Sequence, residues 1–386
     1  MSVTAAEGFV AAGAHCGIKQ GRRDLALLAT EDRRPVPTAA VFTQNRFRAP
    51  PVELSLARLT AAERRSVGVV VNSGNANAGT GARGAADAAL MADTAAEAAG
   101  CEPGHMLVCS TGIIGALLPM RKILNGLPGL GAALSRDGDQ DAAEGILTTD
   151  TRTKQHLTRS EGFTLGGMAK GCGMIAPNMA TMLAFLTTDA EVDPASLQAM
   201  LSEAVPDTFN ALTVDGATST NDTVILMASG RRGPQPLNAV AGAVRAACED
   251  LAMQMARDAE GRTKIVTVRV TGALSDAEAR LAARRIGSNQ LVKCSWYGGD
   301  PYWGRLLAEA GASGVGFETE RASVAYGGIV VAEGGAPRPH DAEAVARHMA
   351  REELDIVVDL GLGQGRGHIV AVDLGPGYIK ENAGTS

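Results

Sequence analysis

The sequence has 386 residues and a formal net charge of -6, and 45% of its residues are hydrophobic but only 3% aromatic. The chain is long enough for two domains, or for one large α/β domain with an appendage, and its core must be built mainly from aliphatic side chains. The modest charge and the lack of a basic block argue against nucleic-acid binding. No apolar run approaches transmembrane length, and the N-terminus lacks a basic stretch followed by an apolar segment. We therefore expect neither a membrane span nor a signal peptide.

The cysteines bear on metal binding and on the cellular compartment. There are six of them, Cys16, Cys101, Cys109, Cys172, Cys248 and Cys294. No C-x-x-C pair occurs, and no cysteine has a histidine at metal-ligand spacing, so no metal site is predicted. We interpret all six as reduced thiols, which predicts a cytoplasmic protein.

Short apolar runs separated by glycine and charged residues predict three strands near the N-terminus. These strands are expected at residues 25–28, 39–43 and 66–71. The third runs into a loop of glycine and asparagine, residues 72–81, and a helix over residues 85–99 follows, ended by Gly100. Such a loop can hold an anion at the helix N-terminus, but the G-x-x-x-x-G-K-[ST] pattern is missing. We expect a tight connection whose side-chain amides bind its own backbone.

Two hydroxyl-bearing segments follow. A strand over residues 106–109 leads into Ser110-Thr111-Gly112, and a Thr-Gly pair at a strand end leaves backbone N–H groups that can point at a developing oxyanion. Residues 148–151 (TTDT) are rich in hydroxyls and suit a pocket lining. The simpler interpretation of both segments is a turn or an N-cap cluster.

The stretch over residues 170–186 carries the clearest chemical signal. Gly171, Gly173 and the Pro-Asn pair at 177–178 predict a tight turn, and the apolar run 182–186 predicts a buried strand. Thr181 lies at the edge of that strand, where a hydroxyl is fixed and still accessible. If it attacked the Ala180 carbonyl, hydrolysis of the ester would leave Thr181 as a new N-terminus, whose amine could serve as base for its own hydroxyl. Alternatively, Thr181 is simply a β-branched strand residue.

The second half of the chain alternates helices with strands. We expect a helix capped by Asp193, a strand over 224–227, a long helix from about residue 239 and a strand over 265–270. Glu260 then lies at a helix-to-strand corner, where it is either functional or simply solvated. Ser275 begins a capping box, and a soft domain boundary follows residue 286. The last predicted elements are a helix over 341–352 and two strands, 355–360 and 369–374, joined as a hairpin through the glycines of 361–367.

Seven of these segments together resemble one family, the ornithine acetyltransferases, also called glutamate N-acetyltransferases. The matching segments are residues 71–77 (VNSGNAN), 110–115 (STGIIG), 148–151 (TTDT), 170–183 (KGCGMIAPNMATML), 258–261 (DAEG), 291–293 (LVK) and 300–305 (DPYWGR). They cover nearly the whole chain in the family's order, and the stretch around Thr181 resembles its self-cleavage motif. Two departures from the family pattern are Tyr302, where the family usually has Asn, and an ending that is one residue shorter.

The resemblance implies transfer of the acetyl group of N-acetylornithine to glutamate in arginine biosynthesis, through an acetyl-Thr181 intermediate with ping-pong kinetics. It implies cleavage between Ala180 and Thr181 into an α chain, 1–180, and a β chain, 181–386, which stay together, usually as α2β2. Thr111 and Gly112 would form the oxyanion hole. By the same resemblance, the residues that bind substrate are Thr148, Lys170, Thr181, Glu260, Asn382 and Ser386. No cofactor is implied.

We accordingly expect an α/β fold of layered mixed β-sheets with flanking helices (αββα-like), with a catalytic domain over 1–286 and a smaller C-terminal α+β domain over 287–386. Three alternatives stay open. The protein could be an amidase or aminopeptidase in which water resolves the acyl-enzyme, or a paralogue in a secondary-metabolite pathway. It could also be a non-enzymatic α/β protein in which Thr181 only packs. Acetyl-CoA is a further acetyl donor used by some members of the family.

Overall fold

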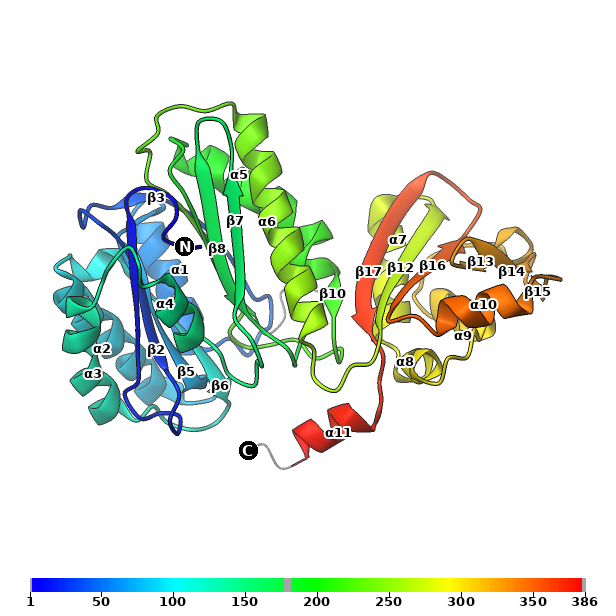
Figure 1. The fold of residues 1–386 in the computed structure, drawn as a ribbon, viewed down its shortest axis with the longest axis horizontal. Coiled ribbons are helices and arrows are strands. Elements are labelled where there is room, and N and C mark those ends of the chain that lie inside the picture. Colours follow the sequence, from blue (N-terminus) through cyan, green and yellow to red (C-terminus); the bar gives the residue numbers. More distant parts are fainter. Residues whose placement is uncertain (1, 177–181, 384–386) are drawn as a thin grey trace. The chain divides into compact units, whose positions relative to one another are not determined.

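The computed structural model describes residues 2–176 and 182–383, and three β-sheets with flanking helices appear among them (Figure 1). These residues form two compact units. The first comprises residues 2–171, 182–208 and 218–255, and the second comprises residues 172–176, 209–217 and 256–383. The long segment of the second unit begins at Ala256, before the boundary expected after residue 286, because the strand and helix that follow it contribute to the second unit's own sheet and core. No helix in the described parts of the chain is long and apolar enough to cross a membrane.

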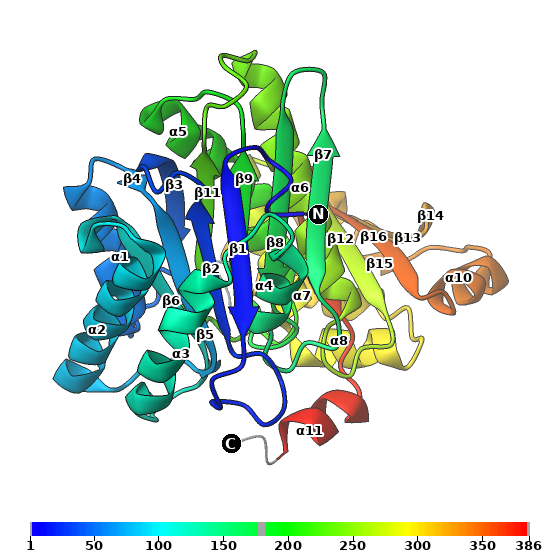
Figure 2. The same cartoon turned by 60° about the vertical axis from the view of Figure 1, so that its left-hand side comes forward.

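The first unit contains a four-stranded sheet of order β1-β2-β5-β6. Its strands are β1 (Phe9–Ala14), β2 (Leu25–Thr30), β5 (Gly68–Asn75) and β6 (Met106–Ile113). Only β5 and β6 are parallel. Alternate residues of β2 point to opposite faces: Leu27 packs with α2 (Gly81–Ala99) and α3 (Met120–Ala132), whereas Leu28 faces the other sheet of this unit. Figure 2 shows α2 and α3 beside this sheet.

The second sheet of this unit has the order β4-β3-β11-β9-β8-β7. Its strands are β3 (Val36–Phe42), β4 (Arg65–Ser66), β7 (Lys154–Arg159), β8 (Thr164–Lys170), β9 (Leu183–Thr188) and β11 (Thr223–Ala228). Phe185 and Ile225 share a core with Leu28 of the first sheet, and α4 (Asp139–Gly145) adds Ala142 and Ala143 to that core. Helices α5 (Pro194–Ala204) and α6 (Leu237–Arg257) also belong to this part of the fold, and α1 (Pro50–Ala61) packs along β6.

The αββα-like prediction is confirmed for the first unit. Its two sheets pack face to face, with α2 and α3 outside one of them. Leu251 of α6 lies against Gly167 of the other sheet, and α5 packs on β3. Local sequence signals had marked several helix ends correctly: Asp193 accepts the N–H groups of Ala195 and Ser196, and Gly100 ends α2 with a φ of 77°.

The second unit is an α+β structure with a sheet of order β10-β17-β12-β16-β13-β14-β15. Its strands are β10 (Leu212–Thr213), β12 (Ile265–Ala273), β13 (Ser323–Tyr326), β14 (Ile329–Glu333), β15 (Ala336–Pro337), β16 (Glu353–Asp359) and β17 (Gly365–Val372). Its helices are α7 (Asp276–Ser288), α8 (Gln290–Tyr297), α9 (Trp303–Gly311), α10 (Ala342–Met349) and α11 (Pro376–Asn382). Ser275 caps α7 by accepting the Glu278 N–H, as predicted.

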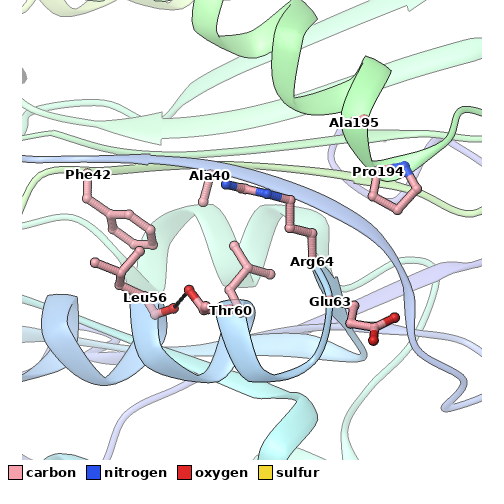
Figure 3. A pocket seen from close by; sticks show the side chains of 9 residues that line it. Ala40, Phe42, Leu56, Thr60, Glu63, Arg64, Pro194 and Ala195 are labelled. Atoms are coloured by element: carbon pink, nitrogen blue, oxygen red, sulfur yellow. Dashed lines mark hydrogen bonds between the residues drawn. The ribbon is translucent and has the colours of Figure 1, made fainter.

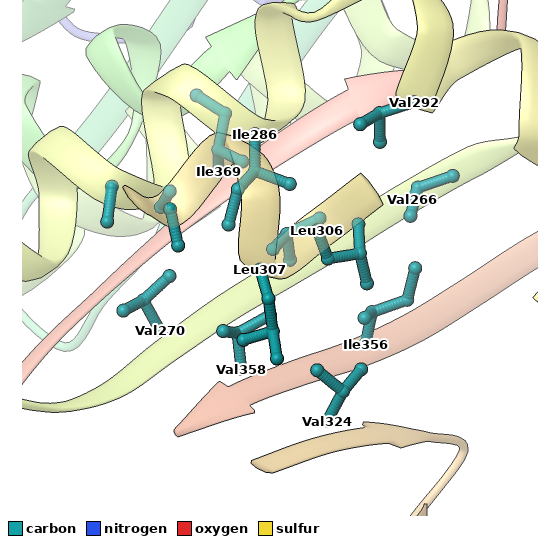
Figure 4. Packing of buried hydrophobic residues seen from close by; sticks show 14 of the residues in the cluster. Val266, Val270, Ile286, Val292, Leu306, Leu307, Val324, Ile356, Val358 and Ile369 are labelled. Atoms are coloured by element: carbon teal, nitrogen blue, oxygen red, sulfur yellow. The ribbon is translucent and has the colours of Figure 1, made fainter. Parts of the chain in front are cut away.

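Aliphatic side chains of α7, α9 and the central strands form the core of this unit, including Val266, Ile286, Leu306 and Ile356 (Figure 4). The hairpin predicted through the glycines of 361–367 is wrong. Strand β12 lies between β16 and β17 and pairs parallel with the first and antiparallel with the second. The connection therefore crosses over β12, a non-local pairing that turn residues alone do not reveal.

Candidate functional site

The predicted site residues fall into two groups according to compact unit. Thr111, Gly112, Thr148 and Lys170 belong to the first unit. Glu260 and Asn382 belong to the second unit. The predicted nucleophile Thr181, its neighbour Ala180 and Ser386 lie outside the described residues.

Thr111 and Gly112 lie near the C-terminal end of β6, which pairs with β5. The strand extends further than predicted, to Ile113, so the Thr-Gly pair is still paired with β5. Thr111 is buried, whereas Gly112 is exposed and has a φ of 132°, which favours glycine. The register of the two strands shifts beside Gly74, as in a β-bulge. Such irregularities free backbone N–H groups from the ladder at the end of a strand.

Side-chain amides hold the end of β6 in place. Asn221 donates to the carbonyl oxygens of Ser110, at 2.9 Å, and of Ala76, at 2.6 Å. Asn72 accepts the Ser110 hydroxyl at 2.6 Å and donates to the Asn75 carbonyl at 2.8 Å. The prediction that amides of the 72–81 loop bind its own backbone is confirmed, and they also fix the strand that carries Thr111.

Lys170, at the end of β8, contacts Thr111. It is the last residue of β8 and is 2% exposed. Its Nζ donates to the Thr111 hydroxyl at 3.4 Å and lies 3.8 Å from Oδ2 of Asp150. Thr148 joins the same group, because its N–H donates to Asp150 Oδ2 at 3.0 Å. The structure therefore gathers Thr111, Thr148 and Lys170, three residues that the sequence had singled out separately.

Asp150 is one of the residues that sequence reasoning did not single out. It is 1% exposed, and its Oδ1 accepts the Gly171 N–H at 2.7 Å and the Lys154 ammonium at 2.6 Å. Burial pushes the pKa of this carboxyl up, but the charges of Lys170 and Lys154 outweigh burial and hold the pKa well below its usual range. Asp150 is thus an ionised, buried anchor. An acidic residue inside the hydroxyl-rich segment 148–151 was the available signal.

A loop after β1 adds two more cations. Lys19 donates to the Leu147 carbonyl at 2.6 Å, and Arg22 donates to the carbonyls of Thr148 and Asp150 at 3.3 Å and 3.2 Å. Burial, followed by the neighbouring Arg22, lowers the pKa of Lys19 to about 8. Lys19, Lys154 and Lys170 interact electrostatically with the Asp150 carboxylate, and Arg22 contacts the backbone beside it, so the surroundings of residues 147–150 are electropositive.

The chain is anchored directly after the predicted nucleophile. The N–H of Met182 donates to Oδ1 of Asp222 at 2.9 Å. Asp222 is fully buried, and among the described residues its Oδ2 has no hydrogen-bond partner. Burial raises the pKa of this carboxyl well above its usual value. Sequence reasoning had not identified this contact, because residues 182 and 222 are joined only by the fold.

Glu260 and Asn382 meet in the second unit. Asn382 Nδ2 donates to Glu260 Oε2 at 2.9 Å, although Asn382 lies 122 positions further along the chain. Glu260 is 9% exposed, and its N–H donates to the Cys172 carbonyl at 2.9 Å. A Cβ on Gly173 would come 2.3 Å from Glu260 Oε2, so glycine is needed where the chain passes this carboxylate. The corner position predicted for Glu260 is confirmed, and the carboxylate there is buried rather than solvated.

Asp215 fixes the chain before the predicted cleavage site. Its carboxylate accepts the N–H groups of Met174 and Ile175 at 2.6 Å and 3.0 Å, and the Tyr378 hydroxyl at 3.1 Å. Burial raises its pKa despite these donors. Asp215 therefore links α11, the helix that ends at Asn382, to the segment that leads toward residue 180. No motif or local pattern pointed to this contact.

A separate pocket of about 400 Å³ lies between β3, α1 and the start of α5 (Figure 3). Its lining is mostly apolar and includes Phe42, Leu56 and Pro194, with Arg64 at its edge. None of the predicted site residues lines it. The Thr60 hydroxyl in its lining donates to the Leu56 carbonyl at 2.8 Å, and we do not assign the acyl-transfer site to this pocket.

Comparisons with known proteins agree on one family. The ArgJ family model matches residues 10–385. The arginine biosynthesis bifunctional protein ArgJ of Chlorobaculum tepidum is 45% identical over 385 residues, which cover 97% of this chain and 95% of that protein. The ArgJ protein of Thermus thermophilus is 46% identical over 384 residues, 99% of each chain. A crystal structure of ArgJ from Bacillus halodurans shares 39% identity, covers 51% of this chain and 96% of that chain, and has a TM-score of 0.49.

Proposed function

The chain belongs to the ArgJ family, and from this premise we propose that it is an acetyltransferase of arginine biosynthesis that moves the acetyl group of N-acetylornithine to glutamate. The observation that carries the proposal is the convergence of Thr111, Thr148 and Lys170 around the buried Asp150. That group combines Thr111, proposed to stabilise the oxyanion, with Lys170, a cation that can bind a substrate carboxylate.

The reaction begins with self-cleavage. The Thr181 hydroxyl attacks the Ala180 carbonyl carbon, the peptide nitrogen leaves as the new amine, and water hydrolyses the ester. The new α-amine of Thr181 then accepts the proton of its own hydroxyl while that hydroxyl attacks the acetyl carbonyl of the donor. Ornithine leaves with a proton, and glutamate attacks acetyl-Thr181 by the reverse route.

Thr111 and Gly112 stabilise the oxyanion in both half-reactions, and loss of one such donor typically costs about a hundredfold or more in rate. Lys170, beside Thr148, binds the α-carboxylate that the two amino acids share. The electropositive surroundings of residues 147–150 support this role. Glu260, with Asn382, binds the ammonium of the ornithine side chain, and the hydrogen bond between them supports a joint role. Ser386 completes the substrate contacts in this scheme.

The two products of cleavage, 1–180 and 181–386, remain associated. Strand β9, from the second product, pairs with β8 of the first over six residues, from Leu165↔Thr188 to Lys170↔Leu183. Strand β11 of the second product likewise pairs with β3 of the first. These ladders support a stable αβ protomer. The α2β2 assembly and the cytoplasmic location belong to the same proposal.

Comparing wild type with Thr181→Ala tests the proposal. We expect two polypeptides for wild type, the second beginning Thr-Met-Leu-Ala-Phe, and one uncut, inactive polypeptide for the variant. Thr60→Ala, on the surface of α1, is the matched control and should be cut and active. Transferase activity in Thr181→Ala would refute the mechanism.

The acceptor distinguishes transfer from hydrolysis. Glutamate should accelerate ornithine release and become acetylated, whereas an amidase or aminopeptidase would release acetate and ornithine at a rate independent of glutamate. Replacing N-acetylornithine by acetyl-CoA in the same assay measures the second donor activity that the name "bifunctional" of the relatives suggests. A screen of other N-acyl donors would identify a secondary-metabolite paralogue.

A further inference from the structure

One buried carboxylate is shared unequally by two ammonium groups in the first unit. Lys154, fully buried, lies 2.6 Å from Asp150 Oδ1. Lys170 Nζ lies 3.8 Å from Asp150 Oδ2 and 3.4 Å from the Thr111 hydroxyl. The contact of Lys154 is therefore short, whereas the contacts of Lys170 with Thr111 and Asp150 are both long for hydrogen bonds from an ammonium.

Asp150 is held so that it does not turn fully toward Lys170. The backbone N–H groups of Gly171 and Thr148 donate to its two oxygens, at 2.7 Å and 3.0 Å. Lys154 in turn is fixed on β7, where it pairs with Ala169 of β8, next to Lys170. The geometry thus gives Lys170 the field of a nearby negative charge without a close ion pair.

We propose that Asp150 and Lys154 are a positioning pair: Lys154 holds the Asp150 carboxylate, and this leaves the ammonium of Lys170 in place and available to a substrate carboxylate. This inference rests on the substrate role proposed above for Lys170. Without Asp150, the ammonium groups of Lys154 and Lys170 would repel each other with no carboxylate between them. Without Lys154, Asp150 would bind Lys170 closely and compete with the substrate for it.

Other charges act on the same group. Lys19 and Arg22, from the loop after β1, add positive charge near residues 147–150. Asp222, in the loop before β11, is an acidic residue that interacts electrostatically with Lys170. These three residues are unchanged in the variants below. The difference in KM between each variant and wild type therefore measures the effect of Asp150 and Lys154.

The single variants should fail in different ways. For Lys154→Met, we expect the KM values for glutamate and N-acetylornithine to rise about tenfold at every pH between 6 and 9, with kcat within about threefold of wild type. For Asp150→Asn, we expect a smaller rise in both KM values, of about threefold, because two ammonium groups with no carboxylate between them repel each other and displace Lys170. A purely structural role would lower kcat together with substrate binding in both variants.

The double variant Asp150→Asn/Lys154→Met should have KM values closer to wild type than either single variant, because it removes both the competing carboxylate and the repelling ammonium. Multiplicative increases in KM would overturn the proposal. Lys122→Met removes an exposed lysine and serves as the control, with wild-type KM expected. A denaturing gel of each protein establishes that it has been cut before its kinetics are compared.

Lys170→Met distinguishes a failure of the substrate role of Lys170 from a failure of the Asp150–Lys154 pairing. If it leaves both KM values unchanged, the substrate role of Lys170 fails and the pairing fails with it. If it raises them while Lys154→Met and Asp150→Asn keep wild-type KM at every pH, the pairing alone is refuted. Should Asp150→Asn not fold, Lys154→Met decides, because it keeps a carboxylate that Lys170 can neutralise: a pH-independent rise supports the pairing and a wild-type KM overturns it.

Discussion

A Cβ atom on Gly112 would lie 2.3 Å from the carbonyl carbon of Gly74, on the neighbouring strand. The two strands approach this closely only because residue 112 carries no side chain. A larger residue at 112 must push the end of β6 away from β5, and with it the backbone N–H groups proposed to bind the oxyanion.

We therefore expect Gly112→Ala to lower kcat about a hundredfold or more, with a much smaller change in KM. Gly115→Ala is the matched control, because Gly115 also has a positive φ, of 87°, but open space around the position of a Cβ. Steady-state kinetics of the cut proteins decide the matter. Equal losses in the two variants would show that backbone strain, and not the approach to Gly74, limits activity.

Glu260 should discriminate between donor and acceptor. Its carboxylate accepts from Asn382, and we propose that it faces the ornithine ammonium. Removing the charge in Glu260→Gln should raise KM for N-acetylornithine about tenfold or more and leave KM for glutamate nearly unchanged. Glu352→Gln, at an exposed ion pair with Arg262 in the same unit, is the control. A parallel rise in both KM values would contradict the assignment.

Asp24 predicts how the first unit responds to acid. Burial raises the pKa of this carboxyl, but the N–H groups of Cys16, Lys19 and Ile18 outweigh burial and lower it. A carboxyl with a lowered folded pKa contributes stability above its unfolded pKa, near 3.9, and loses that contribution as the pH falls further. Asp24→Asn should cost about 1–3 kcal/mol at pH 7 and much less near pH 3, measured by urea unfolding. A pH-independent difference would contradict this.

Lys293 predicts how the second unit responds to alkaline pH. It is 1% exposed, and burial lowers its pKa to about 8, against the charges of Asp215 and Asp373. Between pH 8 and about 10.4, the usual lysine value, the unfolded chain binds more protons, so this group makes the protein more stable as the pH rises. Relative to wild type, Lys293→Met should show a smaller gain in unfolding free energy from pH 8 to 10. Identical slopes would contradict the assignment.

Sequence reasoning succeeded where the signal is local. The strand predicted at residues 25–28 and the helix ends at Asp193, Ser275 and Gly100 follow from side chains within a few positions. The grouping of Thr111 with Lys170 was implied by family resemblance, and its geometry came only with the fold.

Contacts between distant residues were not predictable in the same way. The role of Asp150 depends on pairing across β7 and β8, and the contact of Asp222 with Met182 joins residues 40 positions apart. The hairpin error at residues 361–367 has the same cause. Glycines indicate a turn but do not determine which strands pair. In the structure β12 lies between β16 and β17 and pairs with both.

The position of β9 between β8 and β11 has a consequence for any mixture of variants. Breaking the peptide bond between residues 180 and 181 leaves every hydrogen bond of these ladders intact. The two polypeptides can therefore separate only if the strands of this sheet dissociate. Each mature copy would keep the two polypeptides with which it was synthesised. Two variants altered in different halves, mixed after purification, should not exchange segments to regenerate an unaltered enzyme, whereas joint synthesis in one cell offers that opportunity before the sheet closes.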